Sequence, residues 1–235
     1  MIPYRDENPT RTTPVLIYVF IALNVAAFLY SIFTPEGFEH WIMRWGLIPA
    51  ALWKNPGGGM PPHYVGLFSS MWLHGGFLHI LGNMWFLWIF GDNVEDHLGH
   101  GRFITFYLVC GVIATLTHAL IAHEATVPLV GASGAIAGVL AAYLRFYPRH
   151  RVRAVIPLFI TAFFVRLPAA VFIFFWLAMQ LLGQLQWQAM VAAGQQGGGV
   201  AYGAHLGGFA AGFILAGPFA HGRGEPRRPP PDRGW

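Results

Sequence analysis

Long apolar stretches dominate the sequence, and short polar segments separate them. A bilayer core needs roughly 20 apolar residues for each α-helix that crosses it. Six stretches come close to that length, at residues 14–33, 77–90, 102–121, 131–148, 168–185 and 200–219. The pattern predicts an all-α polytopic membrane protein whose six transmembrane helices pack as one bundle over residues 14–220.

The segments between these stretches differ in composition. Residues 34–76 are rich in Trp and in Pro-Gly clusters, and aromatic residues at this density favour a loop at the membrane interface. Residues 145–166 are basic with an apolar centre, so we expect a second interfacial segment there. No small-residue cleavage pattern follows the first apolar run, which predicts a retained helix. Residues 221–235 hold too few apolar side chains to fold alone, so we expect a disordered tail.

The composition supports a membrane protein. The chain is 55% hydrophobic and 10% charged, with a mean hydropathy of +0.50, whereas soluble domains carry about 25% charged residues. Cys110 is the single cysteine, which excludes an intramolecular disulfide and a cysteine-rich metal site. The pI near 9.5 is better explained by membrane topology than by a nucleic-acid partner.

The basic residues separate to one side of the six predicted helices. An even number of helices puts both termini on the same side, and that side also receives most of the arginines. Its twelve members are Arg5, Arg11, Arg102, Arg145, Arg149, Arg151, Arg153, Arg166, Arg223, Arg227, Arg228 and Arg233, while the other side receives Arg44 and Lys54. This bias predicts that residues 1–13 and the tail are cytoplasmic. Thirteen of the fourteen basic residues are Arg and only Lys54 is a lysine, which hints at a GC-rich bacterial genome. We expect a bacterial inner membrane.

Ser133 and His205 lie within apolar stretches, where polar side chains are costly and usually functional. Ser133 begins the fourth predicted helix and His205 lies near the start of the sixth, both toward the non-cytoplasmic side. A serine hydroxyl becomes a strong nucleophile when an imidazole accepts its proton. The pair predicts a catalytic dyad that hydrolyses peptide bonds within the membrane. No third, acidic member of a triad is evident.

His79 and Asn83 lie at the same predicted depth, in the second helix. Their i, i+4 spacing puts both side chains on one helix face. An imidazole N–H and a carboxamide NH₂ there predict an oxyanion hole, together with the free N–H groups at the start of the fourth helix. The alternative is that both side chains bond neighbouring helices.

Glycines recur at four-residue spacing around both dyad residues. Stripes of small residues let the backbones of membrane helices approach closely. We expect the glycines to bring the fourth and sixth helices together around the site. The glycines concerned are Gly131, Gly134, Gly138, Gly208 and Gly212.

These residues together resemble the rhomboid family of intramembrane serine proteases. The matching motifs are residues 131–134 (GASG), 204–208 (AHLGG), 79–83 (HILGN) and 91–98 (GDNVEDHL). The resemblance implies a six-helix fold, Ser133 as nucleophile, His205 as base, and His79 and Asn83 in the oxyanion hole.

Three further positions bear on the comparison with the family. His74 matches an outer-side histidine of some members. Some members carry an aromatic residue under the catalytic histidine where this chain has Ala137. Some have a Trp-Arg pair ahead of the second helix, where this chain reads Tyr-Val-Gly at 64–66.

The sequence argues against three other functions. A rhomboid-like protein that binds clients without cleaving them would typically lack Ser133 or His205. A transporter or proton channel would usually show internal repeats or charged residues at mid-membrane, and the sequence shows neither. A metalloprotease motif begins at His123-Glu124, but Val127 stands at the second histidine position. We therefore expect no metal or cofactor, and we expect transmembrane substrates, single-span or other, that are cut near the non-cytoplasmic membrane boundary.

Overall fold

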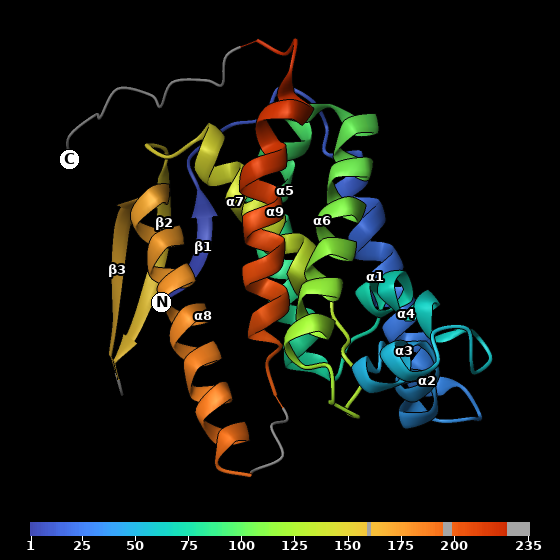
Figure 1. The fold of residues 1–235 in the computed structure, drawn as a ribbon. Helices are drawn as coiled ribbons and strands as arrows, with labels where there is room; N and C mark the ends of the chain where they lie inside the picture. Colours follow the sequence, from blue (N-terminus) through green and yellow to red (C-terminus); the bar gives the residue numbers. More distant parts are fainter. Residues whose placement is uncertain (159–160, 195–198, 225–235) are drawn as a thin grey trace.

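The fold is a helical bundle with a small sheet against one side (Figure 1). The structure is a computed structural model, and it describes residues 1–158, 161–194 and 199–224. The six main helices are α1 (Val15–Phe33), α5 (Phe77–Leu98), α6 (His100–Ile121), α7 (Ser133–Phe146), α8 (Ala169–Ala192) and α9 (Tyr202–Ala220). Each begins within a few residues of a predicted helix, so the predicted helical membrane bundle is confirmed.

Three helices differ in length from the prediction, since α5 and α8 run on to Leu98 and Ala192 and α7 is shorter. In the described residues, α1, α6, α8 and α9 are long and apolar enough to cross a membrane, and α5 forms a fifth span if it is joined to the preceding short helices across a 72° bend. Helix α7 has only 14 residues, about 21 Å at 1.5 Å per residue, so it is shorter than the bilayer core. Its first residue, Ser133, therefore lies inside the bundle.

Helix α5 continues past the predicted end at residue 90 because its acidic side chains have partners. The Glu95 carboxylate accepts hydrogen bonds from the backbone N–H groups of Leu16 and Ile17, each at 3.0 Å. Those N–H groups belong to the first turn of α1 and have no partner within that helix. The acidic end of α5 thus caps α1.

Residues 34–76, predicted as an interfacial loop, form several short helices beside α1. They are α2 (Phe38–Trp45), α3 (Pro49–Lys54), η1 (His63–Val65), α4 (Gly66–Ser69) and η2 (Ser70–Trp72). An antiparallel bridge between Leu47 and Leu129 ties this segment to the loop before α7.

A three-stranded sheet, which the sequence analysis did not predict, lies on the α8 side of the bundle (Figure 1). Its strands β1 (Ile2–Asp6), β2 (Arg151–Leu158) and β3 (Thr161–Pro168) pair antiparallel in that order. The sequence analysis expected an interfacial segment at 145–166 but did not predict that it forms strands. Alternating residues of β2 explain the difference, because Val152 and Ala154 are fully buried while their neighbours are not, as in a half-buried strand.

Ion pairs fix the N-terminal segment to this sheet. The Glu7 carboxylate bonds Arg153 Nε at 2.5 Å and Arg166 Nη2 at 2.7 Å. The backbone N–H of Glu7 also donates to the carbonyl of Arg151. Residues 1–13 are thus folded onto the bundle.

Helix α7 is the centre of the molecule. Every residue of α7 except Ser133 and Arg145 is buried, as expected for a helix that is apolar all round. The other helices and the sheet surround it, with α9 in front of it in the view of Figure 1.

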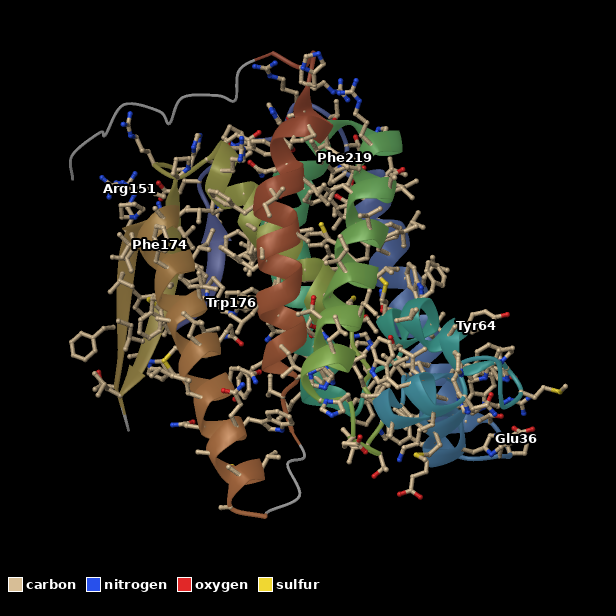
Figure 2. The ribbon with its side chains drawn as sticks, viewed as in Figure 1. Glu36, Tyr64, Arg151, Phe174, Trp176 and Phe219 are labelled. Atoms are coloured by element: carbon tan, nitrogen blue, oxygen red, sulfur yellow. The ribbon has the colours of Figure 1, made fainter. Side chains whose placement is uncertain are left out.

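The two ends of the bundle differ in charge. Figure 2 labels Arg151 and Phe219 toward one end and Glu36 and Tyr64 toward the other. The Arg151 end also holds the start of the C-terminal segment, where Arg223 Nε donates to the Leu98 carbonyl at 2.9 Å. The rest of the predicted disordered tail, residues 225–235, lies outside the described residues.

Candidate functional site

Ser133 and His205 are in hydrogen-bond contact. The distance from Ser133 Oγ to His205 Nε2 is 2.8 Å, although the residues are 72 positions apart in the chain. Ser133 is the first residue of α7 and His205 lies in the first turn of α9. A hydroxyl bonded to an imidazole nitrogen is the arrangement in which the imidazole accepts the proton of a nucleophile.

Glycines make this contact possible. A Cβ added at Gly208 would overlap the carbonyl oxygen of Gly134, and one added at Gly212 would overlap that of Gly138. The backbones of α7 and α9 therefore touch directly at two successive turns. Any larger residue at these positions would push the two helices apart and separate Ser133 from His205.

The turn before α7 brings α5 close to Ser133. Gly131 has φ +127°, which L side chains rarely adopt, and its N–H donates to the Ser70 carbonyl at 2.9 Å. A Cβ at Gly131 would lie 2.7 Å from His79 Nε2 and 3.6 Å from Asn83 Nδ2. The chain two residues before Ser133 thus passes beside both predicted oxyanion donors.

His79 and Asn83 each present an N–H group toward this turn. The N–H of Gly75 donates to His79 Nδ1 at 3.3 Å, so the proton of the neutral ring lies on Nε2. Asn83 Nδ2 is buried and has no hydrogen-bond partner among the residues that the structure describes. Both groups can therefore donate to an additional acceptor beside Ser133.

The four residues line one cavity of about 980 Å³. Its wall also includes α2 and residues 127–130 and 199–201, which belong to the end of the bundle opposite Arg151 and Arg223. Loop residues at that end therefore form part of the cavity wall. Across the described ranges, no group of three or more His, Cys, Asp or Glu side chains could hold a metal ion.

Two residues of α8 that the sequence analysis missed also touch His205. Gln180 Oε1 lies 2.8 Å from His205 Nδ1. The ring centroids of Trp176 and His205 are 5.9 Å apart, with 32° between the planes. Trp176 supplies an aromatic neighbour from another helix, whereas Ala137, at the position where the resemblance expects one, is fully buried. The sequence held one signal for Gln180, because a glutamine is unusual inside an apolar span.

His74 lies beside the site but outside its hydrogen bonds. It is 1% exposed, and its ring centroid is 5.2 Å from that of His79, edge to face. Its two ring nitrogens have no partner among the described residues. Its contact is with His79, not with Ser133 or His205.

Known proteins match the chain over most of this bundle. The model of the Rhomboid domain family matches residues 61–221. RHOMBOID-like protein 4 of Arabidopsis thaliana is 27% identical over 229 residues, which cover 86% of this chain and 52% of that protein. Rhomboid protein 1, mitochondrial, of Saccharomyces cerevisiae is 29% identical over 154 residues, 64% of this chain and 40% of that protein.

A further relative matches more closely over a shorter stretch. RHOMBOID-like protein 5 of Arabidopsis thaliana is 40% identical over 78 residues, 33% of this chain and 25% of that protein. The chain spans between a quarter and about half of the length of these curated relatives. Since the family model covers more than half of the chain and includes all four residues of the site, the chain belongs to the rhomboid family.

Proposed function

We propose that the chain is an intramembrane serine protease that uses Ser133 as nucleophile and His205 as general base. The observation that carries the proposal is the 2.8 Å contact between Ser133 Oγ and His205 Nε2 inside a cavity of the membrane bundle. Membership of a family of intramembrane serine proteases supports it. The retention of both side chains argues against a member that binds clients without cleaving them.

The reaction proceeds by acyl transfer. Ser133 Oγ adds to the carbonyl carbon of the scissile bond while its proton passes to His205 Nε2. The tetrahedral intermediate then collapses, and His205 returns the proton to the leaving amine. Water, deprotonated by His205, hydrolyses the acyl-enzyme and releases the second product with Ser133 restored.

His79, Asn83 and the backbone N–H of Ser133 stabilise the oxyanion of the intermediate. The free donors beside Gly131 support this role. Donors fixed in place before the reaction stabilise developing charge more than mobile water does.

Substrates are transmembrane helices, single-span or other, cut near the non-cytoplasmic boundary. Amides of a helix in lipid are locked in intrahelical bonds, so a substrate must unwind before Ser133 can attack. Unwinding is least costly at the end where the cavity meets loops and water. Residues around the scissile bond should therefore be small or helix-destabilising, as Gly and Pro are.

The proposal assigns residues 14–220 to the membrane domain and places both termini on the cytoplasmic side. The positive charge gathered at one end of the bundle supports this orientation. A bacterial inner membrane stays a prediction, since the relatives named above come from a plant and a yeast.

Labelling with a serine-directed fluorophosphonate tests the nucleophile. The wild-type protein in detergent should be labelled, and Ser133→Ala should not. The matched control is Ser31→Ala, because Ser31 is also buried but donates to the Phe28 carbonyl within α1, and it should label as the wild type does. A wild-type protein that neither labels nor cleaves a single-span substrate would overturn the proposal.

Mass spectrometry of the products tests the position of cleavage. A model substrate with one transmembrane helix should be cut near its non-cytoplasmic boundary. Cleavage at the cytoplasmic end would contradict both the orientation and the assignment of Ser133.

A further inference from the structure

Gln180 and Ser133 contact different nitrogens of the His205 ring. Its Oε1 is 2.8 Å from Nδ1, while Ser133 Oγ is 2.8 Å from Nε2. Both ring nitrogens of His205 are therefore in hydrogen-bond contact, one with α7 and one with α8. The glutamine is only 9% exposed, so water has little access to replace it.

The orientation of the Gln180 amide follows from a second hydrogen bond. Its Nε2 donates to the carbonyl of Trp176, one turn earlier in α8, at 3.1 Å. A carbonyl oxygen accepts and does not donate, so the amide nitrogen must face Trp176 and the amide oxygen must face His205.

This orientation selects one tautomer of His205. An amide oxygen also accepts only, so the neutral imidazole must carry its proton on Nδ1 to bond Gln180. Nε2 is then left with a lone pair that points at the Ser133 hydroxyl. That tautomer is the one a general base requires, and which nitrogen carries the proton is set by the partner of the other.

Helix α8 packs on α9 through side chains, whereas the helices that carry the dyad touch through their backbones. At its start, the N–H groups of Ala169 and Ala170 donate to the carbonyls of His150 and Pro148. Farther along, Gly183 gives the Tyr202 ring the space that a Cβ would take. The outer face of α8 exposes large apolar side chains, among them Phe174, at 58%. The distance from Gln180 to His205 therefore depends on how closely α8 lies against α9.

From this geometry we propose that Gln180 is a positioning residue that holds His205 in the tautomer and orientation needed to activate Ser133, so that catalysis requires α8 to be packed against α9. The inference rests on the proposed role of His205 as base. It adds a third residue to the dyad and connects a peripheral helix to the chemistry. A glutamine that only joined two helices would affect stability and not turnover.

Three variants separate these roles. Gln180→Leu keeps the approximate size but removes the acceptor, whereas Gln180→Glu keeps an acceptor oxygen. The matched control is Gln184→Leu, because Gln184 lies one turn later in α8 and is also 9% exposed. Its Nε2 has no partner among the described residues, and no described hydrogen bond connects Gln184 to His205.

The measurements are kcat and KM for a transmembrane substrate and the melting temperature of the full chain. Gln180→Leu should lower kcat by about 10- to 100-fold, the scale of losing the partner that orients a functional histidine, with KM and melting temperature unchanged. Gln180→Glu should recover most of kcat, and Gln184→Leu should match the wild type. Equal kcat in Gln180→Leu and Gln184→Leu would overturn the inference.

A measurement on the wild-type protein tests the contact without reference to activity. Nitrogen-15 NMR of labelled histidine should show the His205 tautomer protonated at Nδ1, and Gln180→Leu should lose this preference. Protonation at Nε2 in the wild type would overturn the inference even if no variant folds. A wild-type protein with the expected tautomer but without cleavage or labelling would instead refute the proposed protease function.

Discussion

Helices α7 and α8 both hold His205 of α9, but they do so through different kinds of contact. Between α7 and α9, backbone touches backbone, with Gly208 against the Gly134 carbonyl. Between α8 and α9 the contacts are made by side chains, such as the Trp176 ring beside Phe209 at 6.2 Å. Backbone in a helix has no alternative position to adopt, whereas side chains change rotamer.

The difference separates two requirements of the chemistry. The direct backbone packing of α7 against α9 holds the proposed nucleophile and base at contact distance. In our proposal the orientation of His205 depends on α8, whose far end lies away from the rest of the bundle in Figure 1. A single site thus combines a fixed element with an adjustable one.

Removal of the dyad has the largest expected effect. Ser133→Ala and His205→Ala should each reduce cleavage to background, because neither group activates the substrate without the other. The double variant should be no worse than either single variant, since residues that act as a unit are strongly non-additive. Steady-state cleavage rates check this, with melting temperatures to show that each variant is folded. Losses that multiply in the double variant would contradict a shared step.

Asn83→Ala should have the next largest effect. Loss of one oxyanion donor lowers kcat by about 10²- to 10³-fold, with little change in KM. The control is Asn24→Ala, because Asn24 is buried but its Nδ2 donates to the Phe20 carbonyl within α1. An effect on KM alone would make Asn83 a substrate-binding residue.

Much of the fold was predictable because, in a membrane protein, the length of the apolar stretches indicates the spanning helices and the placement of basic residues indicates their orientation. Six apolar stretches gave six helices. The residues of the candidate site stood out because Ser133 and His205 are polar groups in apolar segments at one depth. Their roles stay predictions until activity is measured.

The rest depends on contacts that no local pattern contains. The sheet requires Ile2 to pair with Val155, although helices α1 to α7 lie between these two residues in the sequence. Gln180 and Gln184 look equivalent in the chain, and only the rotation of α8 against α9 decides which of them meets His205. Long-range pairing and helix rotation are set by packing, so they appear only in the folded structure.

Two matched glycine variants compare the contact between α7 and α9 with the contact between α8 and α9. Gly208→Ala puts a methyl group on the Gly134 carbonyl, and overpacking of this kind costs about 1–3 kcal/mol. It should lower both the melting temperature and the cleavage rate. Gly183→Ala meets the Tyr202 ring instead, which moves more easily. This variant should stay folded and lose kcat at the lower end of the range expected for Gln180→Leu, about 10-fold. The reverse pattern would show that α8 is the rigid partner.

The smallest expected effect on cleavage concerns the end of the bundle where the sheet, α7 and α8 meet. Asp6 of β1 accepts a hydrogen bond from the Tyr143 hydroxyl of α7 at 2.8 Å. Burial, and then the charge of Asp92, raise the pKa of Asp6 to about 7 from an ordinary value of 3.8. Since the folded state binds this proton more tightly than the unfolded state, the stabilisation is fully present below about pH 4 and is lost as pH rises through about 7.

Hydrogen exchange of the β1 amides should therefore become faster between about pH 4 and pH 7, beyond the intrinsic increase with pH. Asp6→Asn, which cannot ionise and keeps an oxygen for Tyr143, should remove this extra dependence. Because β1 contacts α7 at Tyr143, ten residues along the helix from Ser133, the cleavage rate of Asp6→Asn should equal that of the wild type. A large loss of cleavage would mean that the sheet controls α8, and with it Gln180, so the adjustable element would extend from α8 to the N-terminal strand.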